Sequence, residues 1–321
     1  QVLGQGTHAC WVRTSCLRCA FALSMASSTV WMLLLGRALG DYLGETWFTG
    51  VKQDNDAKQL RGSFTTVDVA GQKMPMYVSV PPGEHMDRRP AVIVAHHAVG
   101  IYNHAFLRQF ADDLAELGFV AALPDLFHRA WNESIPSGVG IPVEKMNIMA
   151  AIGSLQDEHI LQDVQAVLDA LEQHAQVHNE RIGILGFCMG GRIAWLAAVE
   201  ARFEGRIHAA VSYHGGNVFK GLGHGGAVVQ APADRIKSNL KCSVLGHFGD
   251  VDKNPSPADM RRLQELAGEK LQVRLHPGAD HGFSCKDSAK YADAAARDAW
   301  GETVAFLRRE LGTPEVARPE L

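Results

Sequence analysis

Hydrophobic and polar residues follow two different periods along this chain, and each period predicts one kind of secondary structure. Residues 63–70 alternate and are rich in β-branched side chains, and after a Gly-Gln turn residues 74–80 continue, which predicts an antiparallel hairpin. Short continuous apolar runs are typical of strands buried on both faces of a parallel sheet; they occur at residues 91–95, 119–123, 182–187, 207–213, 242–248 and 271–275. Helical spacing of apolar residues predicts helices over residues 104–117, 154–174, 257–268 and 291–311, and one more after residue 191.

This order of elements predicts a single α/β domain over about residues 61–312. Because strands and helices alternate, we expect right-handed crossovers, a mostly parallel sheet and helices on both of its faces. Ser154 and Asp157 are expected to cap the helix that follows them. Residues 125–153 predict a long irregular connection, which is usually functional in a compact domain. Residues 215–226 are glycine-rich but lack the strand-to-helix setting of a phosphate-binding loop, so a plain loop is expected.

Residues 1–60 differ from the rest of the chain and predict a leader with a polar lead-in. Residues 19–36 are largely apolar, follow Arg13 and Arg18, and are interrupted by serines. Three interpretations stay open: a signal or membrane anchor, a transit peptide, and disordered sequence upstream of a true start at Met25 or Met32. The third is favoured. Residues 313–321 are expected to form a tail.

Composition and charge narrow the class of protein. With 46% hydrophobic and 21% charged residues, the chain has the composition of an ordinary globular enzyme. Residues 1–40 contain three arginines and no acidic residue, whereas the remainder carries 28 basic and 35 acidic residues. A domain with that negative balance has no electrostatic reason to bind nucleic acid or an anionic membrane, so neither partner is expected.

Cysteine usage indicates a reducing compartment. Cys188, Cys242 and Cys285 are the cysteines that follow the leader, and they are odd in number, far apart and without a C-x-x-C pair. Free thiols rather than a disulfide scaffold are therefore expected, in a cytoplasmic protein. The alternative is an organelle-targeted or exported protein, if residues 1–40 are a genuine leader.

Residues 181–195, RIGILGFCMGGRIAW, predict a strand, a sharp turn and a helix with a thiol at the apex. Gly186, Cys188 and Gly190 form the pattern G-x-C-x-G, and a nucleophile on such a strained turn leaves no room for Cβ atoms two residues to either side. A buried, inert cysteine is the alternative. The strand before the motif and the small-residue helix after it favour a nucleophile.

Two further strand ends carry side chains that could activate this thiol. Asp250 and Asp252 follow the strand at residues 242–248, and His281 follows the strand at residues 271–275. Catalytic groups of such sheets gather at the carboxyl ends of the strands. A thiol is mostly protonated at neutral pH, so it needs a base such as His281, whose tautomer an aspartate can fix. The order nucleophile, acid, histidine is that of α/β-hydrolases. Asp252 is preferred as the acid because it lies further out on its loop, with Asp250 as the alternative.

These motifs resemble those of the dienelactone hydrolase (carboxymethylenebutenolidase) family of α/β-hydrolases. The resemblance runs from about residue 63 to residue 311 and includes the segments PAVIV, GFV, PDL, GFCMGG, HFG and ADHGF. It implies an α/β-hydrolase fold, a triad of Cys188, Asp252 and His281, and an oxyanion hole made by the backbone N–H groups of Met189 and Ala98. It also implies hydrolysis of a small-molecule ester or lactone through a thioester intermediate, without metal or cofactor.

Two positions depart from the family pattern. The family has a glutamate after the third strand that helps to take the thiol proton, and His97 stands there; either His97 acts as a neutral base or activation rests on His281 alone. The family also clamps its substrate's carboxylate with two arginines. One of them lies shortly after the catalytic histidine, where this chain has Ser284, Cys285 and Lys286. The family's own dienelactone is therefore not the expected substrate.

Arg108, Arg129 and Tyr213 are candidates for lining the substrate pocket. Two alternatives to an enzyme stay open. One is a non-catalytic α/β-hydrolase-like protein that binds a small molecule, which the two departures favour. The other is a redox-sensing thiol protein, although no resolving cysteine lies nearby in the sequence. We expect a monomer or a homodimer.

Overall fold

A computed structural model describes residues 60–83, 87–102, 105–131 and 147–312. The described residues all belong to the unit Gly50–Leu321. The predictions for residues 1–59 and 313–321 fall outside the described residues. Among the described residues, no helix is long and apolar enough to cross a membrane.

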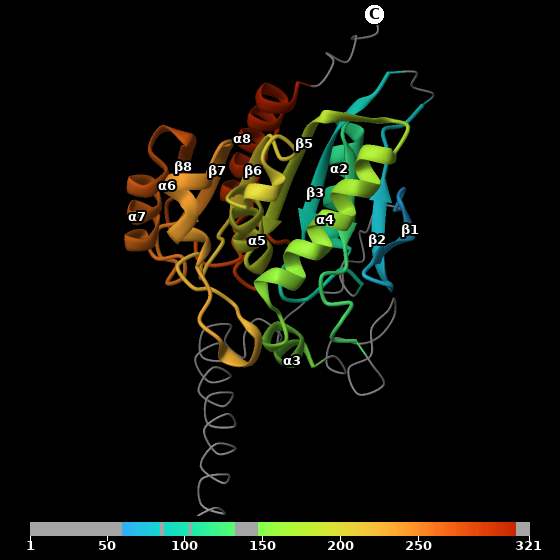
Figure 1. Cartoon of the computed structure of the whole chain (residues 1–321). Helices are drawn as coiled ribbons and strands as arrows, with labels where there is room; N and C mark the ends of the chain where they lie inside the picture. Colours follow the sequence, from blue (N-terminus) through green and yellow to red (C-terminus); the bar gives the residue numbers. More distant parts are fainter. Residues whose placement is uncertain (1–59, 84–86, 103–104, 132–146, 313–321) are drawn as a thin grey trace, which may run out of the picture. The chain divides into compact units, whose positions relative to one another are not determined.

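An eight-stranded sheet forms the centre of the domain (Figure 1). Its spatial order is β1-β2-β4-β3-β5-β6-β7-β8, with β1 and β2 antiparallel to each other, β2 antiparallel to β4, and every other pair parallel. The strands are β1 Ser63–Val69, β2 Gln72–Ser79, β3 Arg89–Ala95, β4 Val120–Pro124, β5 Val177–Phe187, β6 Ala209–Tyr213, β7 Ser243–Gly249 and β8 Leu271–His276. The predicted α/β fold, with its opening hairpin and mostly parallel sheet, is confirmed.

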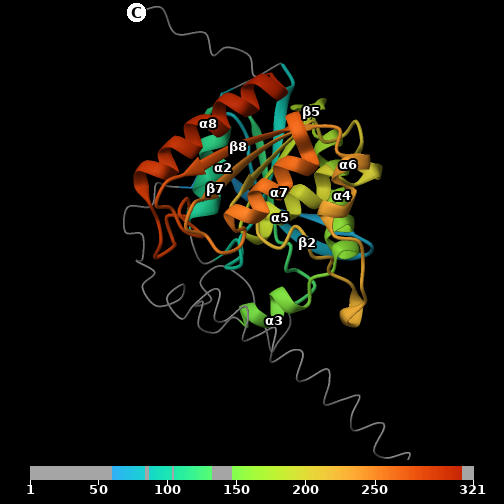
Figure 2. The same ribbon diagram turned by 90° about the vertical axis from the view of Figure 1, so that its left-hand side faces the viewer.

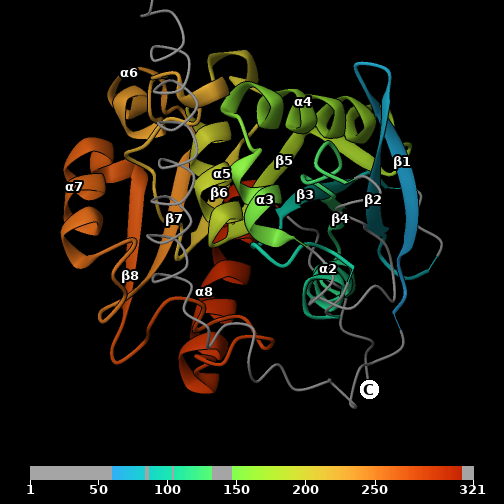
Figure 3. The same cartoon turned by 90° about the horizontal axis from the view of Figure 1, so that it is seen from below.

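Helices cover both faces of the sheet (Figures 1 and 2). One face carries α2 Phe106–Glu116 and α8 Asp293–Leu311, and the other carries α4 Asp157–Gln173, α5 Met189–Ala198 and α7 Pro257–Ala267. Two short helices, α3 Ile148–Gly153 and α6 Ile236–Asn239, complete the set of α-helices in the described part. Figure 3 shows the molecule from below, where α3 lies nearest the viewer, beyond the lower edge of the sheet.

The core consists of two apolar layers separated by the sheet. Successive side chains of a strand point to opposite faces, so Val92 and Val94 join the layer under α2 and α8, whereas Ile93 joins the layer under α4 and α5. Each of these side chains is at most 1% exposed. Burying a side chain of this size contributes about 1.5–3 kcal/mol, so the continuous apolar runs hold the central strands in place on both faces.

Two local predictions are wrong. The stretch expected to be irregular, residues 125–153, contains α3, and Ser154 is the C-cap of that helix rather than the N-cap of the next one. Its hydroxyl donates to the Ala151 carbonyl at 2.7 Å, so it is not available to α4, which begins at Asp157 after the N-cap Gln156.

Asp157 takes part in a buried ion pair instead of a capping box. Arg192 of α5 donates to its two carboxylate oxygens at 2.7 and 3.0 Å. The same guanidinium donates to the carbonyls of Asn217 and Lys220, and the Leu222 N–H donates to Asp157 at 3.0 Å. The glycine-rich stretch is a loop, as predicted, except that it ends in a short 3-10 helix, His224–Gly226. The Asp157–Arg192 ion pair anchors this loop to α5.

Candidate active site

The stretch with the predicted nucleophile forms a sharp turn between β5 and α5. Cys188 lies between the two elements with φ 55° and ψ −114°, a backbone conformation that costs an L-residue about 1–3 kcal/mol. A Cβ on Gly186 would lie 2.1 Å from the Gly190 carbonyl oxygen, and one on Gly190 would lie 2.0 Å from the Ala95 carbonyl oxygen. The Cys188 N–H donates to the Tyr213 carbonyl of β6 at 2.9 Å. The glycines therefore allow the close approach that the turn needs.

Three strand ends bring Cys188, His281 and Asp252 into one hydrogen-bonded chain. The Cys188 Sγ lies 2.9 Å from His281 Nε2, and His281 Nδ1 lies 3.0 Å from Asp252 Oδ2. All three residues are buried, with exposed fractions of 9% or less. The thiol follows β5, the carboxylate follows β7 and the imidazole follows β8. Such a cluster at the carboxyl ends of parallel strands is what the sequence predicts.

The carboxylate that reaches His281 is that of Asp252. Its second oxygen accepts from the Asn254 N–H at 2.8 Å, which orients the carboxylate. Asp250, the alternative acid, accepts from the Gly278 N–H at 2.6 Å and so ties the turn after β8 to the end of β7. The two acids after β7 therefore have different partners.

The charges and hydrogen bonds around His281 favour its protonated, positively charged form. Burial alone would lower the pKa of His281, but the negative charge of the Cys188 thiolate and the hydrogen bond to Asp252 outweigh it and raise that pKa to about 10. The first turn of α5 begins at Met189, so the positive end of its helix dipole lies at the sulfur. The arrangement thus suits a thiolate–imidazolium pair.

Two backbone N–H groups lie at the predicted oxyanion site. Ala98 follows β3 and is 2% exposed, and Met189 opens α5. Within the described part of the chain, neither N–H donates to an acceptor. For the buried Ala98 this is unusual, because a buried N–H without an acceptor costs about as much as a lost hydrogen bond. For Met189 it follows from its place at the start of α5, since the first N–H groups of a helix have no partner within the helix. Helix α3 covers both positions, since Ile148 packs against Ala98 and Ala151 lies in the cluster that Met189 packs against.

The His97 side chain lies against the carboxylate of Asp287. Its Nε2 is 3.0 Å from Asp287 Oδ2, and the Val99 N–H donates to its Nδ1 at 3.2 Å. Donor atoms of His97, Asp287 and Cys285 all lie within 4.8 Å of one another, which raises the question of a metal site. A metal-bound histidine normally donates its other N–H, whereas Nδ1 of His97 accepts one. The ring proton therefore lies on Nε2, the nitrogen that faces the cluster, and the donor set does not fit a metal ion.

A group of side chains behind the His281 imidazole is not predicted from the sequence. The His214 ring packs edge-on against the His281 ring with 5.0 Å between centroids, and its Nε2 lies 3.0 Å from Ser284 Oγ and 3.7 Å from Cys285 Sγ. Burial raises the pKa of Cys285 well above its usual value and lowers that of His214, so both side chains are neutral. His214 directly follows β6, so its place at the end of a strand, like that of His281, is the sequence signal that marks it.

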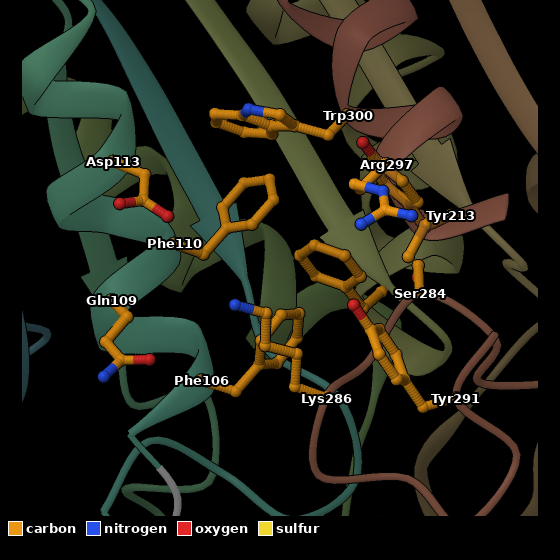
Figure 4. A pocket seen from close by; sticks show the side chains of 12 residues that line it. Phe106, Gln109, Phe110, Asp113, Tyr213, Ser284, Lys286, Tyr291, Arg297 and Trp300 are labelled. Carbon is orange, nitrogen blue, oxygen red and sulfur yellow. The ribbon is translucent and has the colours of Figure 1, made fainter. Parts of the chain in front are cut away.

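Tyr213 lines a cavity of about 150 Å³ between α2 and α8 (Figure 4). Its hydroxyl donates to the Ala299 carbonyl at 3.1 Å. Arg108 donates to the Tyr102 carbonyl at 3.0 Å, and Arg129 pairs with Asp163. Each of these predicted pocket residues is therefore held by a partner within the protein.

A strained turn between a strand and a helix, with the candidate nucleophile at its apex, on a sheet of this topology defines the α/β-hydrolase class. The family model described as the dienelactone hydrolase family matches residues 74–311. A Bradyrhizobium protein named "Probable 2-oxo-3-(5-oxofuran-2-ylidene)propanoate lactonase" is 33% identical over 227 residues, which cover 70% of this chain and 85% of that protein. The chain belongs to the dienelactone hydrolase family, and it is an ester or lactone hydrolase.

Solved structures agree with this assignment. A Klebsiella pneumoniae protein described as a "Putative Dienelactone Hydrolase" superposes with a TM-score of 0.63 at 26% identity, covering 78% of this chain and 98% of its own. An esterase of Thermogutta terrifontis superposes with a TM-score of 0.58 at 15% identity, covering 82% of this chain and 100% of its own, which shows the shared fold.

Proposed function

We propose that the chain hydrolyses small esters or lactones through a thioester on Cys188. The observation that carries this proposal is the buried hydrogen-bonded chain from Cys188 through His281 to Asp252. Nucleophilic catalysis requires a base within hydrogen-bond reach of the nucleophile and a third group that orients the base.

In the first half of the reaction, the Cys188 thiolate attacks the substrate carbonyl carbon and forms the C–S bond. The carbonyl oxygen becomes an oxyanion, which the N–H groups of Ala98 and Met189 stabilise. The tetrahedral intermediate then collapses, the C–O bond to the leaving group breaks, and protonated His281 gives its Nε2 proton to the leaving oxygen. Asp252 keeps the imidazole oriented throughout.

In the second half, His281 takes a proton from water, and the resulting hydroxide attacks the thioester carbonyl. The same two N–H groups hold the second oxyanion. Expulsion of the thiolate releases a carboxylic acid and restores the thiolate–imidazolium pair. For a lactone, the acid and the alcohol are parts of one product, because the leaving oxygen stays attached to the acyl chain.

The proposed substrate is one that does not depend on a carboxylate clamp. Cys285 is fully buried and neutral where the family has an arginine, and Arg108 and Arg129 are held by Tyr102 and Asp163. A guanidinium clamp is not replaced by a thiol. Neutral aryl esters and simple lactones are therefore expected to turn over with higher kcat/KM than dienelactones that carry a carboxylate.

Hydrolysis of p-nitrophenyl acetate by the wild type and by Cys188→Ala tests the proposal, with Cys242→Ala as a control at another buried cysteine. Cys188→Ala is expected to abolish turnover, Cys242→Ala to retain it, and substrate to protect Cys188 from iodoacetamide. A wild type that hydrolyses none of a panel of small esters and lactones, with Cys188 unreactive, would instead support a non-catalytic binding protein.

A further inference from the structure

His96 connects two loops at the edge of the sheet where the oxyanion site is proposed. The side chain is 0% exposed and directly follows β3. The Leu126 N–H, two residues after β4, donates to His96 Nε2 at 3.0 Å. The other ring nitrogen, Nδ1, lies 2.7 Å from the His97 carbonyl oxygen, and the ring packs edge-on against Phe127 with 4.7 Å between centroids.

These contacts determine which nitrogen of His96 carries the proton. The Leu126 N–H can only donate, so Nε2 is the acceptor and Nδ1–H is the donor to the His97 carbonyl. Burial lowers the pKa of His96 to about 4, so the ring is neutral at the pH of the reaction. The imidazole is therefore held in one tautomer, with both nitrogens used by the backbone.

The orientation of one peptide bond follows from these contacts. The His97 carbonyl also accepts from the Gly100 N–H at 3.1 Å, so two donors hold it. A trans peptide is planar, and its C=O and N–H groups point in opposite directions. The N–H of the same peptide belongs to Ala98. With the carbonyl held by His96 and Gly100, this N–H points away from both of them, and it has no acceptor among the described residues.

We propose that His96 is a positioning residue that aims the Ala98 N–H at the oxyanion of the tetrahedral intermediates. This inference rests on the proposed function, because it assigns a task in the same reaction. One oxyanion-hole donor is worth about 10²–10³ in kcat, and a displacement of about 1 Å can cost about 10². Loss of the Nδ1–H donor leaves only Gly100 to hold the carbonyl, so a smaller loss, of about 10- to 100-fold, is expected.

Two substitutions separate the two hydrogen bonds of His96. In His96→Asn, the amide nitrogen can take the place of Nδ1 and donate to the His97 carbonyl. In His96→Gln, the longer side chain can reach the place of Nε2 and accept from the Leu126 N–H, but the carbonyl loses its donor. We expect His96→Gln to lower kcat for p-nitrophenyl acetate about 10- to 100-fold with little change in KM, and His96→Asn to keep kcat within about fivefold of the wild type.

Alkylation of Cys188 by iodoacetamide gives a readout that does not involve an oxyanion. The thiolate displaces iodide at a saturated carbon, so the rate follows the thiolate form of Cys188, which His281 and Asp252 favour, and it needs no oxyanion donor. Equal alkylation rates in the wild type and both variants, with kcat lowered only in His96→Gln, support the inference. It is overturned if His96→Gln keeps the wild-type kcat, if both variants lose kcat equally, or if alkylation slows in parallel with turnover. Failure of the proposed function is distinguishable from this, because the wild type then either hydrolyses none of the esters and lactones or keeps its turnover in Cys188→Ala.

Discussion

Gly190→Ala tests the close approach of the turn between β5 and α5 to the end of β3. Gly190 belongs to α5, and in most helices alanine is better than glycine by about 0.5–1 kcal/mol. Here, however, a Cβ would lie 2.0 Å from the Ala95 carbonyl oxygen, 2.5 Å from the Ala95 carbonyl carbon and 2.8 Å from the His96 carbonyl oxygen. These atoms are backbone at the end of β3, so no side chain can rotate away to make room.

The size of the effect follows from that overlap. Ordinary contact between a carbon and its neighbour is about 3.5 Å, so α5 and the end of β3 must move apart by more than 1 Å. Overpacking of this kind costs about 1–3 kcal/mol or somewhat more, and here it outweighs the gain in helix propensity. The movement also displaces Ala98 relative to Cys188, so we expect kcat to fall by about 10².

Thermal unfolding and p-nitrophenyl acetate hydrolysis measure the two effects. Gly301→Ala is the matched control, because Gly301 lies within α8 and nothing lies within 4 Å of the place that a Cβ would occupy there. For a domain of this size, about 1 kcal/mol shifts Tm by about 2–4 °C. Gly190→Ala is expected to lower Tm by roughly 5–10 °C and Gly301→Ala to raise it slightly. If both variants are stabilised and active, α5 does not approach the end of β3 as closely as the structure shows, and the reasoning is refuted.

Four further outcomes are expected. Cys188→Ala removes the thiolate charge, so the pKa of His281 should fall from about 10 when the ring is titrated by NMR; an unchanged pKa would contradict the charge pairing. Because the folded protein raises the pKa of His281, protonated His281 stabilises the fold. This stabilisation is complete below about pH 6.5 and is lost as the pH rises through about 10. The Tm of the wild type should therefore fall towards that of Cys188→Ala over this range. Asp252→Asn should lower kcat by about 10⁴ and Asp250→Asn should change mainly Tm, whereas equal kcat losses would refute the assignment of the acid. Mass spectrometry after iodoacetamide treatment of the native protein near neutral pH should find Cys188 alkylated and Cys285 unmodified; prompt labelling of Cys285 would contradict its burial and raised pKa.

The sequence was sufficient for the central sheet because burial there leaves a strong pattern. The runs at residues 91–95 and 182–187 lie within β3 and β5, which pair at the middle of the sheet. Once the strands are placed, their carboxyl ends are placed too. The strand order alone therefore predicts that Asp252 and His281, which are 29 positions apart in the chain, lie beside Cys188.

The features that the sequence did not predict depend on short segments or on distant contacts. Helix α3 has six residues, too few for a helical period to stand out within a stretch rich in proline and glycine. Ser154 has the residue type of an N-cap, but its hydroxyl bonds back to Ala151. His214 and Ser284 meet only because two loops 70 positions apart lie side by side, and no local pattern records that contact.

The backbone of Cys188 sets the stability of the fold against the presence of a thiol at a single position. Its φ of 55° lies where glycine is comfortable and a residue with a Cβ is not, so the fold alone would favour glycine there. A glycine at this position would therefore relieve the backbone strain and at the same time remove the thiol. The surrounding β5, β6 and α5 supply the stability that this one residue gives up.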